Sequence, residues 1–244
     1  MTAHVAHAFD GAAGYDAAAL VQAHAAERLA QHIARLPHPP APRMLEVGCG
    51  TGLLSQALIG RIAPGPWLLT DIAPAMLDRC AARIGSRPDI AYAQLDGEHP
   101  DVSGPFDLIA SSFVFQWFAD LPGALTRLRG LLAPGGHIAF ATMADGSLAE
   151  WDAAHRTTGH DAAMASYPTL DQLRAMGATV NEERFVERHA DARAFLASLR
   201  AIGAHRPRDA RAPVPASVLR RAMAAFDAAG AAVTYHIAYG VIVA

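Results

Sequence analysis

Lysine is absent from this chain of 244 residues, and all 20 of its basic side chains are arginines. We attribute this bias, which accompanies a richness in alanine and proline, to genomic base composition and not to function. Cysteine occurs only at Cys49 and Cys80, which excludes a disulfide framework and favours reduced thiols in a cytoplasmic protein. No apolar run is long enough to span a membrane, and residues 1–10 lack the features of a secretion signal.

Clusters of metal-ligating residues are also missing. The 12 histidines are scattered, and the closest groupings, His4 with His7 and His155 with His160, have no cysteine or carboxylate to complete a ligand set. We therefore expect no metal. What the chain has is 52% hydrophobic and 18% charged residues, the composition of a globular protein. Its length suits one large α/β domain with an insertion.

The stretch Met-Leu-Glu-Val-Gly-Cys-Gly-Thr-Gly at 44–52 carries the clearest chemical signal. Its apolar residues predict a buried parallel strand, and its three glycines predict a tight turn that a ligand can approach closely. Apolar residues at helical spacing follow from Leu53. A strand, a turn and a helix N-terminus gather free N–H groups at the carboxyl end of a sheet. That arrangement suits a nucleotide, or a nucleoside that carries a carboxylate.

The glycine spacing distinguishes two cofactor classes. A dinucleotide fingerprint requires a third glycine where this chain has Leu53. With Glu46 in front, the run is Glu-x-Gly-x-Gly-x-Gly, and it resembles motif I of the class I S-adenosylmethionine (AdoMet) methyltransferases. A nicotinamide enzyme and a structural turn that binds nothing are the alternatives.

Two acidic positions follow the next predicted strands. Asp71 ends the strand that begins at Trp67, 19 residues after Gly52, where an acid can accept both ribose hydroxyls. Its alternative role is to cap the helix predicted at 75–84. Asp96, with Gly97, closes the strand predicted at 90–95. Methyltransferases of this class commonly place an acid there against the adenine amino group, and an ordinary polar loop is the alternative.

The remaining pattern predicts an α/β fold. A helix is expected at 16–36, with Leu20, His24, Leu29 and Ile33 along one side. Further strands are expected at 106–111, 135–142, 178–189 and 233–243, and further helices at 121–132, 147–156, 170–176, 191–202 and 214–228. This matches the class I methyltransferase Rossmann-like fold: a seven-stranded, mostly parallel sheet of order 3-2-1-4-5-7-6 with an antiparallel seventh strand. Helical insertions follow strand 5 and separate strands 6 and 7.

We expect a single domain with four parts. An N-terminal lid and helix occupy 1–42, and the AdoMet-binding core occupies 43–142. Helical insertions that bind substrate or partner, with strand 6, occupy 143–232, and the last strand occupies 233–244. The motifs of adenine-amino methyltransferases, Asp-Pro-Pro-Tyr and Asn-Pro-Pro-Phe, do not follow the fourth strand. No cysteine lies there to act as a nucleophile on a pyrimidine. Together with a net charge of −3, these absences disfavour a nucleic-acid substrate.

Several longer stretches are more particular than motif I. They are Phe9–Asp16, Leu45–Leu53, Ser111–Trp117 with its Gln-Trp pair, Phe140–Leu148, Leu199–Ala204 and Thr234–Gly240. Through them the chain resembles, along nearly its whole length, the malonyl-acyl-carrier-protein O-methyltransferases of biotin biosynthesis. The resemblance implies transfer of a methyl group from AdoMet to the free carboxylate of a malonyl thioester. That carboxylate is already ionised at pH 7, so no general base is needed.

This interpretation assigns roles to individual residues. The residues expected to bind AdoMet are Glu46, Gly48, Gly50, Gly52, Asp71, Ile72, Asp96, Gly97, Ser111 and Trp117. Tyr15 and Tyr167 are expected to close over the site and face the sulfonium, and the alternative is that each is an ordinary core aromatic. Arg200, in Leu-Arg-x-Ile-Gly-Ala, is expected to hold the malonyl carboxylate through its planar fork. The alternative is that Arg200 and the other arginines of its segment form a solvated face.

The partner is predicted from charge. Residues 184–221 contain nine arginines and three acids, a net charge of +6, which leaves −9 for the rest of the chain. Such a segment can steer an acidic acyl carrier protein. We expect a monomer that binds neither nucleic acid nor membrane. The alternatives are an O-methyltransferase of another acid, such as aconitate, or of a natural product, and a non-catalytic AdoMet-binding subunit.

Overall fold

The computed structural model describes residues 18–63, 65–162, 166–203 and 214–244. Seven strands form one sheet in the order β3-β2-β1-β4-β5-β7-β6. β1 to β5 run parallel to one another, and β7 runs antiparallel to both β5 and β6. The predicted strand order and the antiparallel seventh strand are therefore confirmed. The strands are β1 (Met44–Val47), β2 (Trp67–Asp71), β3 (Ile90–Gln94), β4 (Phe106–Ser112), β5 (Leu132–Met143), β6 (Thr179–Arg188) and β7 (Ala232–Val243).

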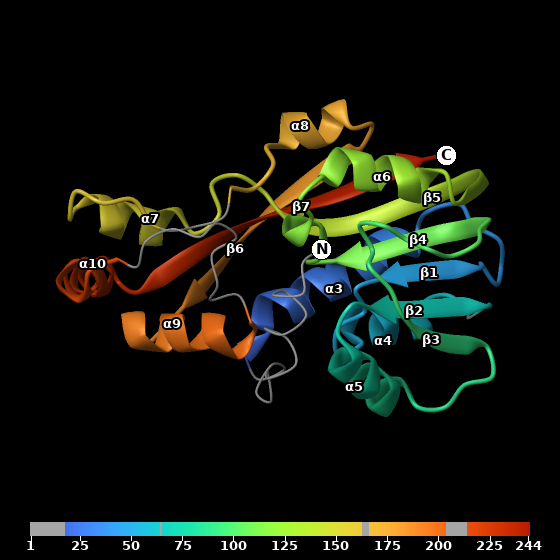
Figure 1. Cartoon of the computed structure of the whole chain (residues 1–244), viewed down its shortest axis with the longest axis horizontal. Helices are drawn as coiled ribbons and strands as arrows, with labels where there is room; N and C mark the ends of the chain where they lie inside the picture. Colours follow the sequence, from blue (N-terminus) through green and yellow to red (C-terminus); the bar gives the residue numbers. More distant parts are fainter. Residues whose placement is uncertain (1–17, 64, 163–165, 204–213) are drawn as a thin grey trace.

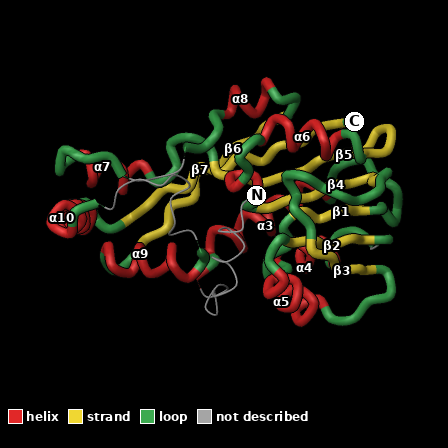
Figure 2. Tube along the Cα trace, in the orientation of Figure 1, coloured by secondary structure: helices red, strands yellow, loops and turns green. Residues whose placement is uncertain are grey.

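Helices cover both faces of this sheet (Figure 2). They are α3 (Leu20–Ile33), α4 (Leu53–Ile59), α5 (Pro74–Ile84), the 3₁₀ helix η1 (Phe115–Trp117), α6 (Leu121–Arg129), α7 (Ala149–Arg156), α8 (Leu170–Ala175), α9 (Ala192–Ala201) and α10 (Ala216–Ala228). Leu29 of α3 and Leu58 of α4 belong to one core cluster. Leu128 of α6 and Leu173 of α8 belong to a second cluster. Met44 and Leu45 are neighbours on β1 and belong to different clusters. Successive side chains of a strand point to opposite faces, so the two clusters lie on opposite faces of the sheet.

The centre of the sheet positions the site. All four residues of β1 are buried, because β2 and β4 flank the strand and helices cover both its faces. Apolar side chains suit such a strand, and Glu46 is its one charged residue. The carboxyl ends of β2, β1 and β4 meet at one edge of the sheet, which is where ligands bind in folds of this kind.

The last two strands extend beyond the rest of the sheet as a long ribbon, with α7, α9 and α10 around its far end (Figure 1). Three aromatic side chains join these helices: the ring of Trp151 lies 5.3 Å from that of Phe195 and 5.4 Å from that of Phe226. The insertion after β5 therefore packs against the insertion between β6 and β7.

Two local predictions were wrong. The helix expected at 121–132 ends at Arg129, and Leu132 already belongs to β5, where it pairs with Phe106. The expected apolar side of α3 was also misplaced, because Leu20 is 57% exposed. The buried stripe instead contains Val21, Gln22, Ala25, Ala26, Leu29, Ala30 and Ile33, and its alanines let α3 pack closely on α4.

Candidate active site at the glycine turn

The turn after β1 depends on glycine at three positions. Gly48, Gly50 and Gly52 have φ angles of +70°, +53° and +86°, which L side chains rarely adopt. A Cβ at Gly48 would lie 2.3 Å from Val114 Cγ2, whereas a Cβ at Gly50 would meet no atom within 4 Å. Packing therefore requires glycine at 48. The backbone at 50 faces open space that a ligand can fill.

Asp71 ties this turn to the end of β2. Its Oδ2 accepts a hydrogen bond from the backbone N–H of Gly50 at 2.9 Å, and its Oδ1 accepts one from that of Ala73 at 2.9 Å. The N-cap of α5 is Ala73, so Asp71 does not cap that helix. The carboxylate is nearly buried and lines the pocket described below.

Glu46 is a buried acid beneath the turn, only 1% exposed. The hydroxyl of Ser55 donates to its Oε2 at 2.6 Å. Burial raises the pKa of Glu46 from 4.5 to about 8, so the carboxyl is mostly protonated at neutral pH. Both cysteines are buried, and Cys80 Sγ lies 3.9 Å from the same Ser55 hydroxyl.

A pocket opens at the carboxyl ends of β2, β1 and β4 and encloses about 660 Å³, counting the part open to solvent. The predicted residues that line it are Glu46, Gly48, Gly50, Asp71, Ile72 and Trp117. The structure therefore brings six of the ten predicted cofactor residues to one place.

The other four lie elsewhere and have structural explanations. Gly52 is the N-cap of α4, and a Cβ there would crowd Cys80 Sγ at 3.0 Å. A Cβ on Gly97 would lie 2.2 Å from Val47 Cγ1. The buried hydroxyl of Ser111 donates to the Val47 carbonyl at 2.9 Å. Its neighbour Ser112 lines the pocket instead.

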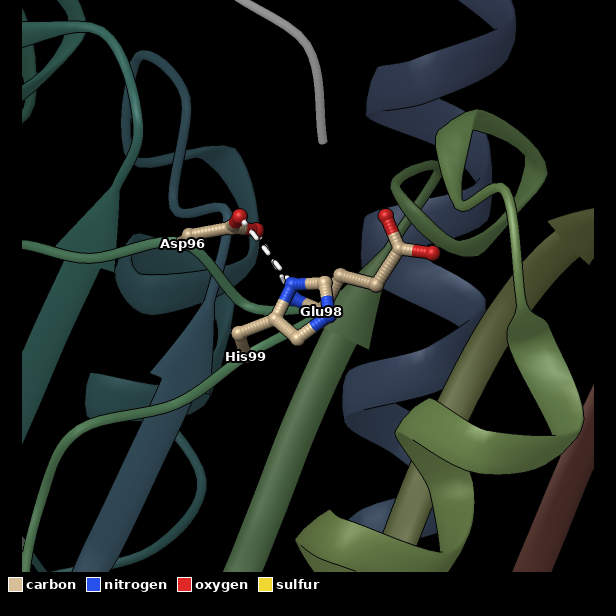
Figure 3. Close-up of side chains that lie close together, drawn as sticks. All are labelled: Asp96, Glu98 and His99. Atoms are coloured by element: carbon tan, nitrogen blue, oxygen red, sulfur yellow. Dashed lines mark hydrogen bonds and ion pairs between the residues drawn. The ribbon is translucent and has the colours of Figure 1, made fainter.

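Asp96, the fourth, lies in a loop beside Glu98 and His99 (Figure 3). Asp96 Oδ1 accepts from the Glu98 N–H at 3.0 Å, and Glu98 Oε1 accepts from the Asp120 N–H at 2.6 Å. Among the described residues these three form the one group whose spacing could suit a metal. A backbone N–H group donates to an oxygen of each carboxylate, so the hydrogen bonds of the loop explain why these side chains lie close together. The absence of a metal stays a prediction.

The two residues of the Gln-Trp pair have different roles in the structure. Gln116 Oε1 accepts a hydrogen bond from the hydroxyl of Thr142 on β5 at 3.1 Å, which anchors η1 to the sheet. Trp117, the next residue, lines the pocket. The pair therefore holds an aromatic ring at the end of β4.

Of the predicted lid and substrate residues, Tyr167 and Arg200 are not among the described residues that line this pocket. Tyr15 is outside the described residues. Tyr167 is partly buried against the larger core cluster, just before α8. Arg200 is exposed in the last turn of α9. Of the nine arginines at 184–221, those at 206, 208 and 211 fall outside the described residues, and the other six are exposed.

The terminal motif Thr-Tyr-x-x-x-Tyr-Gly holds elements together. The hydroxyl of Thr234 donates to Glu150 of α7 at 2.5 Å. The hydroxyl of Tyr239 donates to Glu183 Oε2 at 3.0 Å, and His24 Nε2 of α3 lies 2.9 Å from Glu183 Oε1. A Cβ at Gly240 would lie 2.2 Å from the Phe140 ring. The motif therefore fastens α7 and α3 to the ribbon.

Sequence reasoning missed one polar pocket residue on α3, Gln22, which lines the pocket together with Ala26. The two residues are one helical turn apart, so they share a face of α3. That spacing was the available signal. It was overlooked because the predicted buried side of this helix was placed through Leu20 instead of through Gln22.

A family model for a methyltransferase domain matches residues 45–138. The bifunctional biotin biosynthesis protein BioCD of Bordetella avium is 45% identical over 97% of this chain, which spans about half (51%) of that protein. A malonyl-[acyl-carrier protein] O-methyltransferase of Magnetococcus marinus is 40% identical over 95% of this chain and 89% of its own.

Solved structures agree on the fold. The YcgJ protein of Bacillus subtilis superposes with a TM-score of 0.61 at 13% identity, over 90% of this chain and 98% of its own. No helix among the described residues has the length and apolar character needed to cross a membrane. From the sheet order, the glycine turn and relatives that match over most of both chains, this chain belongs to the AdoMet-dependent malonyl-[acyl-carrier protein] O-methyltransferase family.

Proposed function

We propose that this protein transfers the methyl group of AdoMet to the free carboxylate of a malonyl thioester on acyl carrier protein, giving a methyl ester for biotin synthesis. The observation that carries the proposal is the 40% identity to the Magnetococcus marinus enzyme over nearly the whole of both chains, combined with an intact pocket at the glycine turn.

The pocket has the chemistry that AdoMet requires. Asp71 offers carboxylate oxygens at the end of β2, where a ribose diol can be held. Gly50 leaves open space at the turn for the amino-acid end. The acid Glu46 lies beneath that turn, where a cationic ligand would favour its ionised form. These features suit a nucleoside that carries a cation.

The main task of the protein in this reaction is to orient the acceptor carboxylate relative to the methyl group. Bound AdoMet supplies an electrophilic methyl group on its sulfonium. The acceptor carboxylate has a reference pKa near 4 and is already ionised, so no side chain must remove a proton. The residues of the pocket must align the carboxylate with the methyl group and exclude water, a contribution of roughly 7–11 kcal/mol in favourable cases.

Tyr15 and Tyr167 are the proposed lid, and Arg200 is the proposed ligand of the malonyl carboxylate. A cation over an aromatic ring gains about 0.5–2 kcal/mol, which suits a tyrosine against the sulfonium. The exposure of Arg200 supports its availability to a substrate that arrives from solvent. Normal turnover by Tyr15→Ala would exclude Tyr15 from the lid.

The proposed docking surface is the arginine-rich segment 184–221. The exposed arginines on α9 and α10, at positions 193, 200, 220 and 221, support it, since an exposed cation can meet an acidic carrier protein.

The experiment incubates the protein with labelled AdoMet and either malonyl- or acetyl-carrier protein. We expect a base-labile methyl ester only on the malonyl form, because acetyl has no free carboxylate. Label on neither substrate, but on another small acid such as aconitate, would overturn the proposed substrate while leaving the methyltransferase class intact.

A further inference from the structure

The side chain of Gln22 is buried without a partner for its oxygen. Gln22 is 8% exposed on α3, and among the described residues its Oε1 has no hydrogen-bond partner. Buried amides in folded proteins nearly always find partners, so an orphan acceptor calls for an explanation. The same side chain lines the pocket at the glycine turn. We propose that Gln22 Oε1 accepts a hydrogen bond from the α-ammonium group of AdoMet.

The position of α3 indicates which end of the cofactor Gln22 meets. The pocket extends from Asp71 at the end of β2, past the glycine turn after β1, to Ser112 at the end of β4. α3 packs on α4 and touches β4, and it lies beside the arrowhead of β4 in Figure 1. From these contacts of α3 we place Gln22 toward the β4 end of the pocket, away from Asp71. With the ribose on Asp71, the amino-acid end extends toward Gln22.

The charges of the pocket favour the ammonium as the group that Gln22 binds. Its described lining contains neither arginine nor histidine, and its acids are Glu46 and Asp71. One oxygen of Glu46 already accepts from Ser55, and each oxygen of Asp71 accepts from a backbone N–H. An ammonium has three donors. The orphan Oε1 of Gln22 supplies an acceptor that has no competing bond.

The test compares ligands that keep or lose the amine. We would measure calorimetric affinities of Gln22→Leu and the parent protein for S-adenosylhomocysteine, for S-adenosyl-3-thiopropylamine, which keeps the amine but lacks the carboxylate, and for 5′-methylthioadenosine, which lacks both. Gln22→Leu should weaken the first two about tenfold and leave methylthioadenosine within twofold. Equal weakening of all three ligands, or of none, would overturn the proposal. A loss confined to S-adenosylhomocysteine would mean that Gln22 binds the carboxylate instead.

Two controls separate a ligand role from a structural one. Gln31→Leu removes an amide from the same helix, where it bonds to Glu27 and Arg28, and should leave all three affinities unchanged. The ligand-free thermal midpoint of Gln22→Leu should equal or exceed that of the parent protein, because leucine removes an unpaired buried acceptor. A clear fall in that midpoint together with equal loss for all ligands would mean that Gln22 supports only the fold.

Discussion

At the scale of single residues, one substitution tests both the proposed ribose contact of Asp71 and its hydrogen bond to the glycine turn. Asp71→Ala should weaken AdoMet binding by about 2 kcal/mol, roughly thirtyfold, because charge-assisted hydrogen bonds to the ribose are lost. It also releases the Gly50 N–H that shapes the turn. Asp71→Asn, which keeps one acceptor oxygen, should lose less. Unchanged affinity of the alanine variant in calorimetry would remove Asp71 from the site.

The raised pKa of Glu46 predicts how the free energy of unfolding depends on pH. Its folded pKa of about 8 lies above its ordinary 4.5, so between these values the folded state holds a proton that the unfolded state has lost. The free energy of unfolding should therefore fall as the pH rises from about 4.5 to about 8, and Glu46→Gln should flatten that slope. Chemical denaturation across this range measures it. A slope that is the same in both proteins would contradict the assignment.

The same acid couples cofactor binding to protons. A cationic ligand favours the ionised carboxylate, so AdoMet binding should release protons at pH 7 and strengthen as the pH rises toward 8. Titrations in two buffers of different ionisation enthalpy detect that release. In Glu46→Gln the difference between the buffers should shrink.

Arg200 is tested by comparing carriers. Arg200→Ala should impair methylation of malonyl groups on carrier protein and on coenzyme A alike, since a carboxylate ligand acts on the group that both share. Loss on carrier protein alone would assign Arg200 to docking instead.

At the scale of elements, Glu183 links α3 to the ribbon. Burial alone would raise its pKa, but hydrogen bonds from His24 and Tyr239 outweigh that effect and hold the pKa below its usual range. This stabilisation is complete above the unfolded pKa and is lost as the pH falls through the lower folded value. Glu183→Gln should cost about 1–2 kcal/mol of stability at pH 7 and weaken AdoMet binding, because α3 carries Gln22.

Glu182→Gln is the matched control for this substitution. Glu182 is the preceding residue of β6, and it bonds to His236 instead of to α3. Its removal should leave AdoMet affinity unchanged. If both variants weakened AdoMet equally, the ribbon as a whole would be responsible and not the contact with α3.

Element by element, the sequence predicted what is contiguous along the chain. Glu46 lies on β1 and the glycines follow that strand directly, so motif I located the turn, and the fold that it indicates supplied the sheet order. Ser111 was predicted and Ser112 was not, although Ser112 lines the pocket, because alternation along a strand does not say which face meets the ligand. Gln22 was missed because its environment depends on how α3 docks on α4, which no local pattern encodes. The end of α6 was misjudged because strand pairing of Leu132 prevailed over helical spacing.

At the scale of the whole molecule, charge segregation should control the use of carrier protein. Reversal of Arg206, Arg208 and Arg211 to glutamate should raise the Michaelis constant for malonyl-carrier protein while sparing malonyl-coenzyme A. The effect should shrink at high salt. The matched control reverses three exposed arginines outside that segment, Arg35, Arg129 and Arg174, with the same change in net charge. Equal losses on both substrates would refute docking by the segment.

The place of β7 has a consequence for synthesis of the chain. β6 pairs only with β7 among the described strands, and β7 is inserted between β5 and β6. A ribosome therefore makes β6 before any strand exists for it to join, and the edge of β5 stays open until residues 232–243 emerge. A stop codon just before Ala232 would remove β7 and leave β6 without a pairing partner among the described strands. Such a truncated product leaves an unpaired β5 edge, the kind of surface that templates aggregation.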